Sequence, residues 1–180
     1  MKRIAYLFIG LFASMSQAQD LYDLNPTKSS VQIEGSSSLH DWEMEAKELA
    51  GNFGLNEDKL LDNLIFEATV SGLVSDKSKM TKLAQKSLKI KEYSKITFKS
   101  SSPVGIDGEE IKLSGFLTVS GVTKEIELSL RPKTDDNGIN LEGSYSLKMT
   151  DYGVDPPKAL LGAIKTDNEV TINFSLLFES

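Results

Sequence analysis

The feature that most limits how this chain can fold is the alternation of apolar and polar side chains with a period of two. The alternation is clearest in the segment from Ser114 to Leu130, SGFLTVSGVTKEIELSL, where polar residues separate Ile126, Leu128 and Leu130. A period of two is typical of β-strands with one buried face, and Ser120–Thr123 is short enough to form a hairpin turn. The segment therefore predicts a β-hairpin. Its apolar face meets either packed side chains or a cavity.

Similar strand-like segments recur along most of the chain and are joined mainly by short turns. One of these turns contains Asn137-Gly138, a strong hairpin signal. The pattern predicts an all-β fold, an antiparallel sandwich or barrel of about eight strands. The strand-like segments are 31–33, 40–55, 66–74, 96–98, 113–119, 126–130, 141–149 and 170–178.

Two segments depart from the pattern. In residues 77–91 the apolar side chains recur from Met80 at i, i+3, i+4 and i+8, which predicts an amphipathic helix of about three turns. Residues 150–165 contain Pro156-Pro157, which does not fit a central strand. We expect this second segment to be a loop that ends in a helical turn at 158–161.

The predicted helix is also unusually basic. Ser75 or Asp76 is its expected N-cap, and the segment that follows carries no acidic residue. The helix is either a solvated cover for one end of the β-structure or a basic lid that meets phosphate headgroups, and the two interpretations are compatible. Its lysines are at positions 77, 79, 82, 86, 89 and 91.

The N-terminus has the features of a secretory signal peptide. Lys2 and Arg3 precede an apolar run that is too short to span a bilayer. Small residues at Ser16 and Ala18 match the positions that a signal peptidase recognises. We therefore expect residues 1–18 to be removed and the mature protein to be exported to the periplasm.

The remaining residues 19–180 contain no repeat, linker or second apolar run of spanning length, which predicts a single domain. The chain has no cysteine, and this excludes thiol catalysis and cysteine-ligated metals. The formal net charge is −6, and loss of the two cations Lys2 and Arg3 makes it −8. Nucleic-acid binding calls for a basic surface, so we expect no such partner.

The residues that could support catalysis do not form a recognisable site. The only histidine, His40, is followed by Asp41, and neighbouring residues of a strand point to opposite faces. The carboxylate pairs Glu109-Glu110 and Asp135-Asp136 lie in predicted turns, where acidic residues are common for local backbone reasons. We predict no enzymatic activity, no cofactor and no metal site.

The large apolar side chains expected to face inward could fill or line a small barrel. An eight-stranded barrel can either close with its own side chains or hold one small ligand, and periodicity does not choose between these. Lys82 and Lys86 are candidates for contact with a ligand headgroup. The candidate lining residues are Trp42, Met44, Phe53, Phe66, Met80, Leu83, Phe98, Leu117, Tyr145 and Phe174.

Several motifs give the chain a resemblance to a known family. Gly115–Lys124 reads GFLTVSGVTK and follows the pattern G-x-L-T-v-x-G-v-T-K nearly residue for residue. Ile96–Ser100, Asp151–Val154 and Val170–Ile172 are similar to further motifs of the same family. On these motifs, from about Leu21 to Glu179, the sequence resembles the YceI-like family of exported polyisoprenoid-binding proteins.

The resemblance implies a lipocalin-like antiparallel barrel with a helix near one end. It also implies a hydrophobic interior that takes an isoprenoid chain or another long-chain lipid, of the polyprenyl phosphate or quinone class. His40–Trp42 and Pro156-Pro157 indicate a subgroup of the family. The alternative is a packed, ligand-free domain with a structural or interaction role in the cell envelope or in a stress response. The sequence leaves open whether the protein forms a homodimer.

Overall fold

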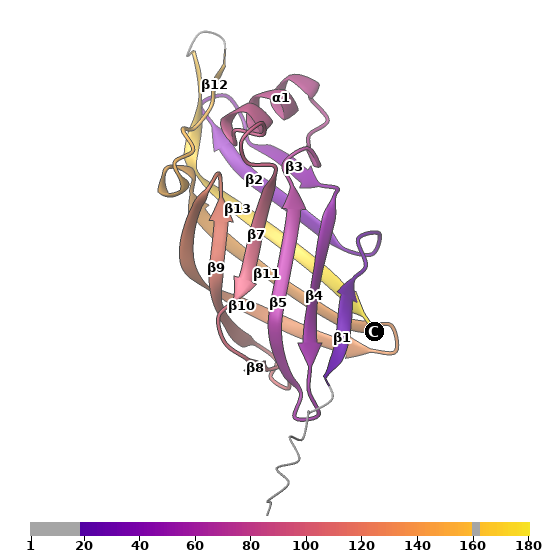
Figure 1. Ribbon diagram of the computed structural model, residues 1–180. Coiled ribbons are helices and arrows are strands. Elements are labelled where there is room, and N and C mark those ends of the chain that lie inside the picture. The colour runs from indigo at the N-terminus through magenta and orange to yellow at the C-terminus, as the bar shows by residue number, and fades with distance from the viewer. Residues whose placement is uncertain (1–18, 160–162) are drawn as a thin grey trace, which may run out of the picture.

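The computed structural model describes residues 19–159 and 163–180. The expected signal peptide, residues 1–18, lies outside the described residues. The described residues form a closed, eight-stranded antiparallel barrel with one short α-helix, as predicted (Figure 1). The elements are β1 (Asp20–Leu24), β2 (Ser30–Ser37), β3 (Trp42–Ala46), β4 (Leu49–Leu55), β5 (Leu60–Thr69), β6 (Leu73–Val74), α1 (Ser78–Ser87), β7 (Lys95–Ser100), β8 (Val104–Gly105), β9 (Ile111–Val119), β10 (Val122–Asp135), β11 (Gly138–Lys148), the 3₁₀-helix η1 (Met149–Tyr152), β12 (Lys158–Ala159) and β13 (Ile164–Glu179).

The barrel has eight strand positions around its ring. Three of these positions are each shared by two consecutive strands, β1 with β2, β3 with β4 and β5 with β6. Strand β13 pairs with β1 through its last residues and with β2 through its middle. Next along the ring, β4 pairs with β1 and β3 pairs with β2. Strand β5 then pairs with β4, and β6 pairs with β3. The order then runs through β7, β9, β10 and β11 back to β13, and all these pairings are antiparallel.

The predicted hairpins are confirmed. Strands β9 and β10 pair from Val119↔Val122 onward, and Ser120 and Gly121 connect them with φ angles of 48° and 80°. A two-residue turn with two positive φ angles matches the twist of the flanking strands. The next hairpin closes at Asp135↔Gly138, which also agrees with the sequence.

The helix is shorter than predicted and begins later. Its N-cap is Lys77, with no side-chain capping bond, so the expected caps Ser75 and Asp76 are wrong. It ends because Lys89 adopts a left-handed conformation with φ 55°. The N–H of Lys89 then donates to the carbonyl of Lys86 (3.0 Å), and that of Ile90 donates to Gln85 (3.1 Å). This is a Schellman motif. The sequence does not predict it, because Lys89 occupies the position where glycine is usual.

The segment before β13 also differs from expectation. Residues Lys158–Ala159 pair with Ile164–Lys165 as a short hairpin, so the expected helical turn is wrong at its first two residues, where pairing with β13 holds the backbone extended. The rest of that expected turn lies outside the described residues. Upstream, η1 ends at Gly153, whose φ of 65° is left-handed.

The lower half of the barrel, opposite α1, is filled by its own side chains. Phe53 and Phe178 are each 0% exposed, and their ring centroids are 4.9 Å apart in an edge-to-face arrangement. Tyr22 stacks on the other side of Phe53 at 5.3 Å. Leu61 and Ile139 are buried within the same core. This end of the barrel is therefore closed.

Candidate functional site

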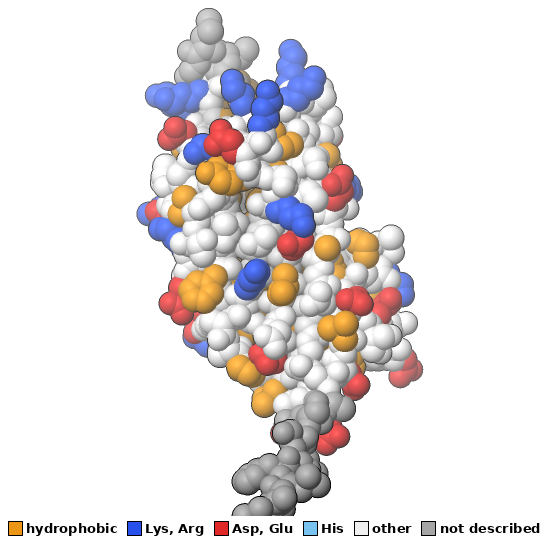
Figure 2. Space-filling model, viewed as in Figure 1, with side chains coloured by type: hydrophobic (Ala, Val, Ile, Leu, Met, Phe, Trp, Pro, Cys, Tyr) orange, Lys and Arg blue, Asp and Glu red, His pale blue; other side chains and the backbone are white. Residues whose placement is uncertain are grey.

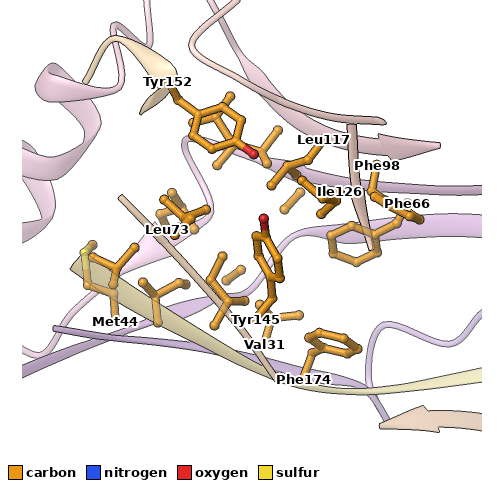
Figure 3. A pocket seen from close by; sticks show the side chains of 18 of the residues that line it. Val31, Met44, Phe66, Leu73, Phe98, Leu117, Ile126, Tyr145, Tyr152 and Phe174 are labelled. Atoms are coloured by element: carbon orange, nitrogen blue, oxygen red, sulfur yellow. The ribbon is translucent and has the colours of Figure 1, made fainter. Parts of the chain in front are cut away.

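The upper half of the barrel, on the side of α1, encloses a cavity of about 230 Å³. Its wall is made of the inward faces of β2, β3, β5, β6, β7, β9, β10, β11 and β13, and α1 and η1 cover its upper end. Figure 3 shows side chains from opposite walls pointing toward a common space, with Phe66, Phe98 and Leu117 on one side and Val31 and Met44 on the other. The predicted inward face thus meets packed side chains below and a cavity above.

Strand register explains why these side chains meet. Met44 pairs with Ile33, Ile33 with Ile172, and Ile172 with Tyr145, so one row across four strands lines the cavity. On the opposite wall Phe98 pairs with both Phe66 and Leu117. Since neighbouring strands place paired residues on the same face, each apolar row becomes a continuous strip of wall.

Two glycines allow aromatic rings to lie flat against the wall. A Cβ on Gly143 would come within 2.7 Å of the Phe174 ring and 2.8 Å of the Ser129 carbonyl oxygen. A Cβ on Gly115 would likewise collide with the Phe98 ring and with the carbonyl oxygen of Lys99. A side chain at either position would push a ring into the cavity, so these glycines help to maintain the space.

The wall of the cavity is almost entirely apolar. Among the described residues that line it, none is charged, and the side chains that carry a polar atom are those of Trp42, Ser87, Tyr145 and Tyr152. An ionised group placed here would lose its hydration without gaining a partner. The arrangement can therefore hold a hydrocarbon chain and exclude charged groups.

A lid, consisting of α1 and its C-cap Leu88, covers the upper opening of the barrel, which we call the mouth. Ala84, Ser87 and Leu88 face the cavity, but no residue of α1 is fully buried. The Gln85 side-chain amide donates to the carbonyls of Ser71 (3.0 Å) and Leu73 (3.2 Å). On the other side of the mouth, the Ser120 hydroxyl donates to the carbonyl of Leu88 (3.1 Å), so hydrogen bonds at two places hold the lid to the barrel rim.

Seven of the ten predicted lining residues lie around the cavity. Phe53 does not, because β4 belongs to the packed lower half. Only the C-terminal half of α1 lies over the mouth, so Met80 lines a separate, more open pocket with His40 and Asp41, and Leu83 lines neither. The seven are Trp42, Met44, Phe66, Phe98, Leu117, Tyr145 and Phe174.

The two candidate headgroup residues, Lys82 and Lys86, are exposed on the outer side of the lid. Figure 2 shows basic side chains gathered at the upper end of the molecule. In the described part of the chain, the salt bridges are formed by Lys28, Lys47, Lys59, Lys95, Lys112 and Lys133, and none involves a lysine of residues 77–91. The positive charge of the lid is therefore uncompensated by direct pairing.

Sequence reasoning missed Tyr152, which is only 2% exposed and lines the cavity from η1. Its hydroxyl points toward that of Tyr145 (Figure 3). Burial raises the pKa of Tyr152 to about 12, and the facing Tyr145 adds to the shift. The D-Y-G-V motif at 151–154 was the available signal, because Gly153 turns the chain so that Tyr152 points inward.

Within the described residues, no helix has the length and apolar character needed to cross a bilayer. His40, the residue of interest for acid–base chemistry, is exposed, and its Nδ1 lies 2.6 Å from the backbone carbonyl oxygen of Asp41. The cavity is the pocket of the described residues whose lining suits an apolar ligand.

A closed antiparallel barrel with an apolar internal cavity and a helical lid defines a class of small β-barrels suited to an apolar guest. The chain belongs to the YceI-like family, since the model of the YceI-like domain matches residues 22–178. The resemblance seen in the sequence is thereby confirmed. No curated protein matches the chain.

Solved structures of the same family share the fold. BcnA of Burkholderia cenocepacia superposes with a TM-score of 0.73 at 17% identity, covering 87% of this chain and 99% of that one. A polyisoprenoid-binding domain from Saccharophagus degradans, implicated in plant cell wall breakdown, gives 0.67 at 18% identity, covering 88% and 98%. The Campylobacter jejuni YCEI protein gives 0.62 at 16% identity, covering 100% and 99%.

Proposed function

We propose that this protein is a non-catalytic binding protein that holds the chain of an isoprenoid lipid, of the polyprenyl phosphate or quinone class, in the upper half of its barrel. The observation that carries the proposal is the uncharged cavity of about 230 Å³ beneath the lid. The description of the Saccharophagus degradans relative as polyisoprenoid-binding supports it. The alternative of a fully packed interior describes only the lower half of the barrel.

Apolar burial alone gives useful affinity. Transfer of hydrocarbon surface out of water contributes about 25 cal/mol per Å², so burial of about 250 Å² contributes about 6 kcal/mol. This value corresponds to a dissociation constant of order 10⁻⁴ to 10⁻⁵ M before any polar contact. Chain length and fit therefore set most of the affinity.

The size of the cavity limits how much of a chain it encloses. An apolar cavity of about 150 Å³ holds one benzene ring, so 230 Å³ corresponds to about ten carbons, or two isoprene units. A longer chain has to extend through the mouth or displace the lid. The absence of fully buried residues in α1 supports a lid that can move.

The lysines of the lid fit a role in orienting the ligand. A phosphate is excluded from the cavity by its desolvation cost, so it remains at the mouth. Lys82 and Lys86 are exposed there and free of salt bridges among the described residues. In this arrangement they attract the headgroup of a phosphate-bearing ligand and set which end of the chain enters first.

We further propose that the mature protein begins after Ala18 and acts in the periplasm. The basic and apolar pattern of residues 1–18 supports export. Strand β1 begins at Asp20, so cleavage after Ala18 removes no strand of the barrel.

Filling the cavity tests the proposal. Ala46 and Ala68 are buried and line the cavity, so the double variant Ala46→Leu/Ala68→Leu places six extra carbons within it. We expect the affinity for geranylgeraniol, measured by quenching of the single Trp42, to fall at least tenfold. Ala50→Leu is the matched control, because Ala50 lies exposed on β4. Unchanged affinity in a folded double variant would contradict binding in this cavity.

A further inference from the structure

Two segments at the upper end of the barrel are basic and contain no acidic residue. The first, residues 77–91, includes the lid and carries six lysines. The second, residues 156–166, includes the β12–β13 hairpin, in which Lys158 pairs with Lys165. Since these two segments carry a charge of +8 and residues 19–180 as a whole carry −8, the remainder of the domain carries −16. The two segments therefore differ sharply in charge from the rest of the protein.

Both basic segments adjoin the cavity at its mouth (Figure 1). Leu88 of the lid lines the cavity, and the exposed Lys89 follows it directly. Pro157 also lines the cavity, and the exposed Lys158 follows it. A surface that contacts both segments therefore also covers the mouth.

The loop between β2 and β3 adds an exposed apolar side chain beside the hairpin. Leu39 is 64% exposed, more than any other large apolar side chain of the described residues. The preceding Ser38 ties the loop to the hairpin, because its N–H donates to the Lys165 carbonyl (2.9 Å) and its hydroxyl accepts from the Lys165 N–H (3.1 Å). Basic residues next to an exposed apolar side chain are typical of surfaces that bind the headgroup region of a membrane.

The charge of the two segments is not neutralised within the described part of the protein. Lys158 and Lys165 are exposed and, like the lysines of 77–91, form no salt bridge with any described residue. Like charges on directly paired residues of a hairpin repel one another, so a negative surface relieves this repulsion. The phosphates of anionic lipids provide such a surface, and each lysine near it strengthens binding about fivefold.

We propose that the upper end of the barrel docks on an anionic lipid bilayer, with the lysines of 77–91 and 156–166 on the lipid phosphates and Leu39 in the headgroup layer. The acidic remainder is repelled by the same phosphates, which orients the barrel with its mouth toward the membrane. An isoprenoid chain then enters the cavity from the bilayer without crossing water. Docking needs no bound ligand, whereas its role in loading the cavity rests on the proposed function.

Vesicle binding in the absence of ligand tests the surface. The probes are vesicles of phosphatidylglycerol and of phosphatidylcholine, and the measurement is co-sedimentation at low ionic strength. Lys158→Glu/Lys165→Glu is the main variant, because neither lysine is assigned to the ligand headgroup. Lys28→Glu/Lys133→Glu is the matched control, since it makes the same charge change outside both basic segments.

We expect the wild type and the control variant to bind anionic vesicles at least tenfold more tightly than zwitterionic ones. Lys158→Glu/Lys165→Glu should lose at least tenfold in affinity for anionic vesicles, and about 0.5 M salt should remove most of the wild-type binding. The affinity of this variant for free geranylgeraniol, measured by Trp42 quenching, should be unchanged.

Two further readouts test the contact of Leu39 and the loading of the cavity. Leu39→Ser should weaken binding to anionic vesicles severalfold, whereas Leu21→Ser should not, although Leu21 on β1 is 59% exposed. Geranylgeraniol supplied within vesicles should quench Trp42 faster from anionic than from zwitterionic vesicles. The wild type should show this difference, and Lys158→Glu/Lys165→Glu should not.

The failures are distinguishable. Equal wild-type affinity for both kinds of vesicle, or wild-type vesicle affinity in Lys158→Glu/Lys165→Glu, overturns the docking surface and leaves the lipid-binding function intact. Equal vesicle affinity of the two serine variants overturns the contact of Leu39 with the bilayer, and equal quenching rates overturn the loading role. Binding of anionic vesicles without quenching by geranylgeraniol contradicts the proposed function and leaves the docking surface in place.

Discussion

At the scale of single residues, the surroundings of Tyr152 determine how it contributes to the pH dependence of stability. Its phenol is neutral in the folded protein because the cavity wall offers little hydration to a phenolate. In the unfolded chain the same group ionises near its ordinary pKa of 10.0. Folding therefore favours the protonated form, and the stabilisation is fully present below pH 10 and is lost as the pH rises toward 12.

The pH dependence of unfolding tests this environment. Between pH 9 and pH 11 the wild type should lose about 1 kcal/mol more unfolding free energy than Tyr152→Phe, because one pKa unit corresponds to about 1.4 kcal/mol. The measurement is urea unfolding at a series of pH values, and the difference between the two proteins cancels the lysines and other tyrosines. Parallel profiles would show that Tyr152 is hydrated in the folded protein.

Phenylalanines at two heights in the barrel should differ in their contribution to stability. Phe53 is fully buried between Tyr22 and Phe178, so Phe53→Ala should reduce the free energy of unfolding by about 3–5 kcal/mol. Phe66 is half-buried and faces the cavity, so Phe66→Ala should cost only about 1–2 kcal/mol, because fewer atoms contact its ring. Urea denaturation at pH 7 gives both values. Equal losses would contradict the division into a packed half and a hollow half.

At the scale of elements, the strands were predictable and the covering segments were not. The β9–β10 hairpin follows from alternation and from Ser120-Gly121, since turn chemistry and apolar period agree. The helix ends at Lys89 because this residue is left-handed, which a lysine does not signal in the sequence. The extended conformation of Lys158–Ala159 depends on pairing with β13, which the local residue pattern does not predict.

The candidate site, too, could be predicted from the sequence only in part. Alternation places Tyr145 and Phe174 on the inner face, but it does not say how far along the barrel each residue lies. Phe53 lies on the inner face, but it packs in the lower half of the barrel and not beside the cavity. The register of β4 sets this position along the barrel, and alternation does not determine that register. Tyr152 lies outside any strand, so the period of two could not identify it.

The lid gives an electrostatic prediction. Lys82→Glu/Lys86→Glu should weaken binding of geranylgeranyl phosphate severalfold at low ionic strength and leave geranylgeraniol binding unchanged. The effect should shrink above about 0.1 M salt, where the Debye length is about 10 Å. Lys28→Glu/Lys133→Glu is the control, because it makes the same charge change away from the lid. If the lid variant has wild-type affinity and salt dependence for the phosphate, the headgroup role is wrong.

At the scale of the whole molecule, one barrel combines two kinds of interior. The lower half resembles the core of an ordinary β-protein and includes the fully buried Phe53, Phe178 and Leu61. The upper half retains space because glycines at 115 and 143 lie beneath aromatic rings and because the helix that covers it has no fully buried residue. Stability and binding are thus assigned to opposite ends, so variants of the cavity wall can change affinity without unfolding the barrel.

The charged side chains near the mouth are also unevenly distributed, with basic residues on the lid and acidic residues on the flank beside it. The lysines of the lid form no salt bridge with any described residue, on a protein whose formal net charge is −6. An open pocket on the flank beside it is bordered by Glu34, Asp41, Asp76 and Glu169. An anionic group is therefore attracted to the mouth and repelled from this flank.

The central claim is that the upper half of the barrel carries a lipid, and native mass spectrometry of the protein isolated from its own cells tests it most directly. We expect a population heavier than the polypeptide alone, whose added mass is lost on organic extraction and restored by an isoprenoid lipid, with no restoration in Ala46→Leu/Ala68→Leu. A protein of unmodified mass that takes up no isoprenoid after extraction would contradict it.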